Sequence, residues 1–192
     1  TWNDKNNQDG KRPASITINL LANGTEVAEK TVTEADKWSW SFDNLPVYVE
    51  GVEQKYTITE DPIKDYTTLV NGYNVTNSTD TASTVVAVYK VWDDKNNQDG
   101  IRPASISVQL SANGTAKGDP VTLNDGNNWS YTWTGLDKMA AGADIVYTVD
   151  EVSVPAGYVK TITGSQSVGY TITNTHTPET TGLEGTKTWV DN

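Results

Sequence analysis

Three polar residues, Lys90, Glu151 and Asn174, lie where apolar side chains are expected. Side chains alternate across a β-strand, so residues two apart share a face. The apolar residues that precede them at this spacing are, in the same order, Val86 and Val88, Tyr147 and Val149, and Tyr170 and Ile172. A carboxyl and an amide therefore continue core faces. The segment around Lys90 is apolar on both faces, which leaves the direction of that side chain open.

Burial would give these three residues a definite chemistry. Desolvation lowers the pKa of a lysine and raises that of a glutamate. The neutral amine of Lys90 could then attack the side-chain carbonyl carbon of Asn174. A protonated Glu151 could polarise that carbonyl and pass protons to the leaving ammonia. The product is a Lys–Asn isopeptide bond, formed once and without turnover, so no enzyme is expected. The alternative is a buried, hydrogen-bonded ionic cluster without a covalent bond.

Short strands must position these residues. Apolar and polar residues alternate between turn signals, as in a half-buried strand, and no segment has a helical period. We expect an all-β fold with one β-sandwich per repeat. The alternating apolar sets are Ile16, Ile18 and Leu20; Trp38, Trp40 and Phe42; Tyr56 and Ile58; Tyr73 and Val75; Trp129, Tyr131 and Trp133; and the sets that lead to Lys90, Glu151 and Asn174.

The chain is an internal repeat. The polar loop at 4–10 returns at 94–100, and Arg-Pro follows both loops. The repeat predicts one domain over residues 1–80 and a second over 81–178. Residues 179–192 would form a linker and the first strand of a third repeat, which contains Lys187.

The sequence resembles the collagen-adhesin B-type (Cna B) repeats of Gram-positive surface proteins. The resemblance rests on Lys-x-Trp at Lys90, Tyr-Thr-Val-x-Glu ending at Glu151, and Ile-Thr-Asn-Thr around Asn174. It implies two tandem inverse immunoglobulin-like (prealbumin-like) β-sandwiches. It also assigns the two cross-linked side chains to Lys90 and Asn174 and the proton shuttle to Glu151.

The first repeat departs from this pattern. Glu60 and Asn77 match Glu151 and Asn174, but the matching lysine would precede Thr1. A bond within this repeat is therefore impossible from the residues given. Lys187 has no matching glutamate or asparagine after it. One possibility is strand exchange between copies through residues 183–191, with Lys187 reaching Asn77.

Other candidate sites are weaker. The Asp- and Asn-rich loops at 4–10 and 94–100 do not fit calcium-loop spacing, so tight turns held by side-chain hydrogen bonds are expected instead of a metal site. The Trp-rich segments could bind a sugar, but their alternation with serine favours a core face. His176 has no catalytic partner in the sequence and is expected at the surface. No cofactor is predicted.

Composition limits the function classes. The 192 residues carry a net charge of -11, which argues against nucleic-acid partners. They include no cysteine, so a disulfide is excluded. No apolar run is long enough to insert in a membrane. With the resemblance, we expect stalk or spacer modules of an extracellular, cell-wall-anchored adhesin or pilus. Their partners would be neighbouring repeats, with a host matrix protein bound by other domains. The alternative is a ligand-binding module for a host matrix protein or glycan.

Overall fold

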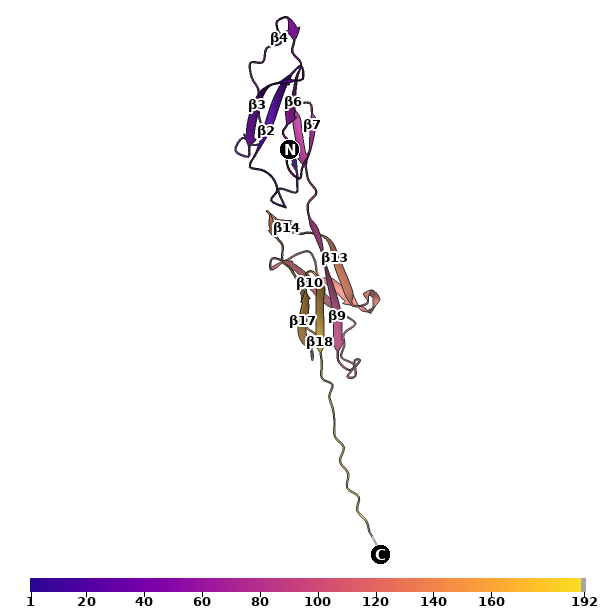
Figure 1. Cartoon of the computed structure of the whole chain (residues 1–192). Coiled ribbons are helices and arrows are strands. Elements are labelled where there is room, and N and C mark those ends of the chain that lie inside the picture. Colours follow the sequence, from indigo (N-terminus) through magenta and orange to yellow (C-terminus); the bar gives the residue numbers. More distant parts are fainter. Residues whose placement is uncertain (191–192) are drawn as a thin grey trace. The chain divides into compact units, whose positions relative to one another are not determined.

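Short β-strands make up the regular structure of the chain (Figure 1). The structure is a computed structural model that describes residues 1–190. It divides into two units. Unit 1 contains Thr1–Ser83 and Asp137–Ile145, and unit 2 contains Thr84–Leu136 and the chain from Val146 onward. Within the described residues the only helical element is a 3-10 turn at Asp125–Asn127, so the predicted all-β class is confirmed.

Unit 1 contains two three-stranded sheets and two short hairpins. One sheet has the order β1-β8-β7, with β1 (Trp2–Asn3), β8 (Asn74–Ser78) and β7 (Thr67–Asn71). The other has the order β3-β2-β6, with β3 (Thr25–Thr33), β2 (Ser15–Ala22) and β6 (Tyr56–Glu60). The hairpins are β4 (Tyr48–Val49) with β5 (Val52–Glu53), and β14 (Met139–Ala140) with β15 (Ala143–Asp144).

The core of unit 1 lies between its two sheets. Ile18 and Leu20 of β2 pack in one buried cluster with Ile58 of β6 and with Val75 of β8. The predicted apolar face at 16–20 is therefore confirmed, whereas Asn19 on the opposite face is also buried and donates to Asp61 Oδ1 at 2.8 Å. Trp2 and Trp38 are half-buried at the margin of this cluster.

Unit 2 also has two sheets. One has the order β13-β9-β18-β17, with β13 (Ser130–Asp137), β9 (Ser83–Asp93), β18 (Gly169–Thr175) and β17 (Val159–Ser165). In the other, β10 (Ser105–Ala112) pairs with β11 (Thr115–Ala116), β12 (Val121–Asn124) and β16 (Tyr147–Glu151). The core side chains include Val86, Val88, Leu110, Tyr147 and Ile172, all nearly inaccessible to solvent.

The first and last strands of unit 2 are parallel neighbours. In their register Lys90 of β9 lies opposite Ile172 of β18, and Trp92 lies opposite Asn174. This pairing brings together two strands at opposite ends of the unit's sequence.

One predicted strand is wrong. Residues 38–42 form no strand, whereas their counterpart in unit 2 is β13, which pairs with β9. The backbone bonds from Lys90 N to Trp129 O and from Lys138 N to Ala82 O show that β13 pairs with the part of β9 before Val91. Thr1 is the counterpart of Val91 in unit 1. Residues 38–42 therefore have no neighbouring strand in this chain and adopt an irregular conformation.

Two predicted core positions are also wrong. Tyr73 precedes β8 and is 62% exposed, and Tyr131 of β13 is 42% exposed. Tyr73 instead donates its hydroxyl to the Tyr56 carbonyl, 3.2 Å away. Tyr131 packs edge-on against Trp133, with 5.0 Å between ring centroids. Alternating aromatic residues predict which side chains share a face of a strand. They do not decide which residues along that face are buried in the core.

After β18 the chain continues as coil through Val190 (Figure 1). The predicted strand over residues 183–191 is therefore not formed up to Val190, and Asp191 and Asn192 lie outside the described residues. Leu183 and Trp189 in this segment are 100% and 71% exposed.

Candidate functional site

Lys90 points into the core of unit 2. Its side chain is 6% exposed and shares a face with the fully buried Val86 and Val88. The amine Nζ donates to the carbonyl oxygen of Val91 at 2.8 Å and lies 3.4 Å from that of Ile172. It also lies 4.0 Å from the centroid of the Trp92 ring. The sequence did not decide the direction of the Lys90 side chain, and in the structure this side chain lies on the buried face of β9.

Burial changes the pKa of the Lys90 amine. Desolvation lowers its pKa to about 8, against the opposing effect of the negative charges on Glu151 and Asp94. A much larger fraction of this amine is therefore neutral near pH 7 than for an exposed lysine. The neutral amine is the form that can act as a nucleophile.

Glu151 and Asn174 meet across the two sheets of unit 2. They are 3% and 0% exposed, and Asn174 Nδ2 donates to Glu151 Oε1 at 3.0 Å. Desolvation raises the pKa of Glu151, although the Asn174 hydrogen bond and the Lys90 charge oppose this shift. Among the described residues, the other two oxygens, Glu151 Oε2 and Asn174 Oδ1, are buried without a hydrogen-bond partner. Such atoms are costly and are common where chemistry is done.

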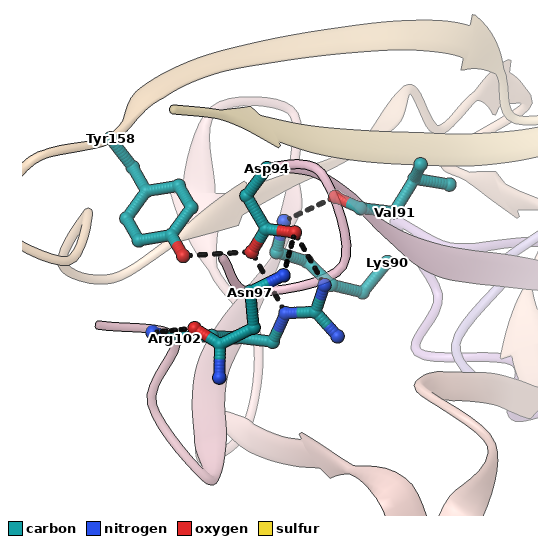
Figure 2. A network of polar contacts seen from close by, with 6 residues as sticks. All are labelled: Lys90, Val91, Asp94, Asn97, Arg102 and Tyr158. Atoms are coloured by element: carbon teal, nitrogen blue, oxygen red, sulfur yellow. Dashed lines mark hydrogen bonds and ion pairs between the residues drawn. The ribbon is translucent and has the colours of Figure 1, made fainter. Parts of the chain in front are cut away.

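A second polar network closes the end of β9 (Figure 2). Asp94 is 1% exposed and accepts bonds from Arg102 Nε at 2.9 Å, from the Tyr158 hydroxyl at 2.8 Å and from Asn97 N at 2.9 Å. The Arg102 guanidinium holds the pKa of Asp94 well below its usual range. Burial and the Asp94 charge raise the pKa of Tyr158 to about 12. Figure 2 also shows the Lys90 amine, which donates to the Val91 carbonyl.

The loop at 94–100 therefore has the role expected for a tight turn. Asp94 Oδ1 accepts from Asn97 N, and Asn97 Oδ1 accepts from Arg102 N. Sequence reasoning missed the contributions of Arg102 and Tyr158 to this network. The recurrence of Arg12 as Arg102 was the available signal, because an arginine repeated beside an aspartate is a candidate buried ion pair.

Unit 1 repeats this arrangement with one changed partner. Asn77 Nδ2 donates to Glu60 Oε1 at 2.9 Å, as in unit 2. Here, however, the Thr68 hydroxyl lies 2.8 Å from Asn77 Oδ1 and 2.9 Å from Glu60 Oε2. Thr68 lies opposite Asn77 on the neighbouring strand, the position that Lys160 takes opposite Asn174. Thr68 thus contacts the two oxygens whose counterparts are unpartnered in unit 2.

Unit 1 contains no counterpart of Lys90 among the given residues, because Thr1 aligns with Val91. The amino group of Thr1 donates to the Val75 carbonyl at 2.8 Å. The Asp4 network is complete, with Arg12 Nε at 2.9 Å and the Tyr66 hydroxyl at 2.9 Å. Unit 1 therefore holds the carboxyl–amide pair and its support. Lys187 lies in the C-terminal coil, with its amine 3.3 Å from the centroid of the Trp189 ring.

The remaining candidates from the sequence concern metal binding, a membrane span and His176. No group of three or more His, Cys, Asp or Glu residues that could hold a metal ion occurs within residues 1–190. The same residues include no helix long and apolar enough to cross a bilayer. His176 is more than a surface residue, since its ring nitrogens contact the Gly157 carbonyl at 2.8 Å and Asp99 Oδ2 at 2.9 Å. Asp99 raises the pKa of His176.

Comparisons with known proteins agree on one family. The model of the Cna protein B-type domain matches residues 1–78 and again residues 86–175. The collagen adhesin of Staphylococcus aureus is 47% identical over 190 residues, which cover 99% of this chain and 16% of that adhesin.

Two solved structures of the Staphylococcus aureus collagen-binding protein are also similar. Its two-repeat structure is 47% identical with a TM-score of 0.51, over 94% of this chain and 48% of that one. Its single B repeat unit is 46% identical with a TM-score of 0.49, over 93% of this chain and 95% of that one.

Proposed function

The chain belongs to the Cna protein B-type domain family, and we propose that it forms stalk modules of a bacterial surface adhesin, held by an isopeptide bond between Lys90 and Asn174. The observation that carries the proposal is a lysine and a glutamate buried in one core, with the glutamate hydrogen-bonded to an asparagine amide. Buried Lys and Glu without a direct ion pair are expensive as a purely structural feature.

The reaction uses only side chains of unit 2. The neutral Lys90 amine attacks Asn174 Cγ, and protonated Glu151 donates a proton toward the amide oxygen as the tetrahedral intermediate forms. The ionised Glu151 then takes a proton from the Lys90 nitrogen and passes it to Asn174 Nδ2. As the Cγ–Nδ2 bond breaks, ammonia leaves and the hydroxyl proton of the intermediate returns to Glu151. A secondary amide remains and Glu151 is again protonated, so the step is balanced and occurs once per chain. No turnover of an external substrate is involved.

The placement of the bond explains a stalk role. Lys90 is in the first strand of unit 2 and Asn174 in the last, so force applied to the two ends loads the covalent bond before the strands can separate. The bond also closes most of unit 2 into a loop. By the chain-entropy estimate used for disulfides of this loop size, it adds roughly 4–5 kcal/mol to stability. The chain has no cysteine with which to achieve this otherwise.

We further propose the finer architecture that the sequence implies. Residues 1–80 and 81–178 are two tandem inverse immunoglobulin-like sandwiches, and residues 179–192 begin a third repeat. The parent protein is extracellular and anchored to the wall of a Gram-positive bacterium. Neighbouring repeats are its direct partners, and any host matrix ligand binds through other domains. The proposal rests on family membership and on the repeat itself.

Intact mass spectrometry tests the cross-link. Wild-type chain is expected to be lighter than its sequence by one ammonia, and Lys90→Ala is expected to show no deficit. Lys117→Ala is the matched control, because it removes an exposed lysine of the same unit and should keep the deficit. A wild-type mass equal to the sequence mass would reduce the cluster to a buried polar network. Specific binding of this chain to collagen or a glycan would replace the spacer role with a binding role.

A further inference from the structure

The ring of His176 lies between two hydrogen-bond acceptors at the end of unit 2. Its Nδ1 is 2.8 Å from the Gly157 carbonyl oxygen, and its Nε2 is 2.9 Å from Asp99 Oδ2. A neutral imidazole carries one N–H, so it can donate to only one of these two oxygens. Both contacts are satisfied only when the ring carries two protons. The geometry therefore favours the positively charged imidazolium.

The surroundings of the ring favour the same charge. The hydrogen bond to Asp99 raises the pKa of His176, and the negative charge on Asp94 at the end of β9 adds to this effect, whereas burial opposes it. The Tyr158 ring packs beside the imidazole, with 5.5 Å between the ring centroids. The side chains of His176 and Asp99 are 14% and 21% exposed, so solvent screens their contact only in part.

The Asp99 carboxylate also holds the segment that follows the last strand. The backbone N–H of Glu179 donates to Asp99 Oδ2 at 2.9 Å. The backbone N–H of His176 donates to the Asp93 carbonyl, also at 2.9 Å. Residues 177–179 are therefore held at both ends by the chain that follows β9. We call Asp99, the His176 ring and the Glu179 N–H the exit clamp.

Unit 1 holds its own exit segment through the equivalent carboxylate. Asp9 is the counterpart of Asp99, and its Oδ2 accepts from Ala82 N at 2.9 Å. Ala82 stands at the same spacing after Asn77 as Glu179 does after Asn174. Residues 79–82 lead directly into β9, so the contact also forms where another unit follows. It is therefore a feature of the repeat.

The two units differ at the position of the histidine. Thr79 takes the place of His176, and its N–H donates to the Asn3 carbonyl at 3.2 Å, as that of His176 donates to the Asp93 carbonyl. A threonine side chain does not change its charge between pH 5 and 8, whereas a histidine does. The carboxylate contact is thus common to both units, and a titrating partner is present in unit 2.

We propose that the exit clamp is a pH-dependent switch, which holds residues 177–179 on unit 2 while His176 is charged and releases them when it is neutral. Loss of one proton leaves a nitrogen lone pair facing either the Gly157 carbonyl or the Asp99 carboxylate, whichever tautomer forms. One contact of the ring is then repulsive. The exit clamp does not rest on the Lys90–Asn174 bond. In the proposed stalk it would make the freedom of the segment after unit 2 depend on pH.

The sign of the pH dependence follows from the direction of the shifts. A histidine with a raised folded pKa contributes its full stabilisation below its unfolded pKa of about 6.5, and loses it as pH rises through the folded pKa. The hydrogen bond from His176 lowers the pKa of Asp99, so the carboxylate stays ionised in mild acid. The exit clamp should therefore be strongest between about pH 5 and pH 6 and weaken above that range.

NMR titration of the whole chain from about pH 5 to pH 9 tests the switch. His176 is the only histidine, so its ring signals need no assignment. The ring should titrate with a midpoint above about 6.5. Over the same pH range the order parameter of the Glu179 amide should fall from about 0.85 to below about 0.6, and that of Ala82 should not change. A Glu179 amide that stays equally ordered through the titration of the ring overturns the proposal.

Matched variants decide whether the two side chains act together. Asp99→Asn keeps the size of the side chain but removes its charge, so it should lower the His176 midpoint. Asp9→Asn makes the same change in unit 1 and should leave that midpoint unaltered. His176→Thr copies Thr79 and should remove the pH dependence of the Glu179 amide. A His176 midpoint that is equal in wild type and Asp99→Asn contradicts the exit clamp, as does a pH-dependent Glu179 amide in His176→Thr.

Discussion

Unit 1 and unit 2 build the same carboxyl–amide pair and complete it differently. In unit 2 the Glu151 charge acts on the buried Lys90 amine, and the oxygens Glu151 Oε2 and Asn174 Oδ1 have no hydrogen-bond partner among the described residues. In unit 1 the Thr68 hydroxyl contacts the corresponding oxygens of Glu60 and Asn77. The comparison teaches that both units form the carboxyl–amide pair, and that unit 2 adds a buried lysine in the same core and leaves two oxygens of the pair without a hydrogen-bond partner among the described residues.

The largest expected effect is on the rate of bond formation in unit 2, which should depend on Glu151 and not on Glu60. Glu151→Gln keeps the shape of the side chain but removes the proton shuttle, so formation of the unit 2 bond should slow by roughly 10²–10⁴-fold. The rate is measured as ammonia loss by intact mass after refolding of unreacted chain. Glu60→Gln is the matched control and should leave the unit 2 rate unchanged. Equal rates in Glu151→Gln and wild type would contradict the assigned role.

The second prediction concerns the stability of each unit. Lys90→Ala should lower the free energy of unfolding of unit 2 by roughly 4–5 kcal/mol through loss of the closed loop, with a further cost from the deleted side chain. Unit 1 should be unaffected. Hydrogen exchange followed by peptide mass spectrometry reports the units separately in one experiment. Unchanged protection of unit 2 would show that no cross-link had contributed to it.

A third prediction tests what the two units share. Asp94→Ala leaves Arg102 without its carboxylate and should cost roughly 3 kcal/mol in unit 2. Asp4→Ala should cost a similar amount in unit 1, because Arg12 and Tyr66 contact Asp4 in the same way. Urea unfolding monitored by exchange in each unit measures both. A large cost in one unit only would break the equivalence of the two networks.

Acid should act on both networks with the same sign. The Arg12 hydrogen bond lowers the pKa of Asp4 to about 2, and Arg102 lowers that of Asp94. A carboxyl whose folded pKa is depressed stabilises the protein above its unfolded pKa, and this contribution is lost as pH falls through the folded pKa. Each unit should therefore lose stability between about pH 4 and pH 2. The Asp4→Ala and Asp94→Ala variants should show a smaller loss over that range.

A bell-shaped pH dependence of bond formation is expected in unit 2. In the reactive form Lys90 is neutral and Glu151 is protonated, so the pair of groups carries one ionisable proton in total. The rate should fall by about tenfold per pH unit well above the lysine pKa of about 8, where the pair loses that proton. It should also fall in acid, where both groups are protonated. Refolding at each pH with timed mass measurement gives the profile, and a rate that rises steadily above pH 8 would rule out the shared-proton scheme.

The smallest expected effect concerns Thr68. Thr68→Val removes the hydroxyl and leaves Glu60 Oε2 and Asn77 Oδ1 unpartnered, as their counterparts are in unit 2. The cost to unit 1 should be about 1–2 kcal/mol, measured by urea unfolding. Thr67→Val is the control, since Thr67 is exposed on the same strand and should change stability by much less. Equal effects of the two variants would mean that the Thr68 hydroxyl has no special role.

Much of this protein follows from its sequence. Period-two alternation placed Glu151 and Asn174 on buried faces, because neighbouring side chains on a strand must point to opposite sides. The repeat and the three spaced motifs predicted the family, the all-β class and the turns at the polar loops. These are local or repeated signals, and each can be read from residues near one another in the chain.

Only the tertiary structure decided the rest. Which face of β9 is buried depends on which side of its sheet meets the second sheet of unit 2, and β9 alone is apolar on both sides. Residues 38–42 form no strand, whereas their counterparts form β13 because β9 lies beside them as a pairing partner. The exchange of Thr68 for Lys160 matters only because β7 and β17 place these residues opposite the asparagines. Sequence patterns fix what a strand can bury, whereas pairing between distant strands fixes what each buried atom meets.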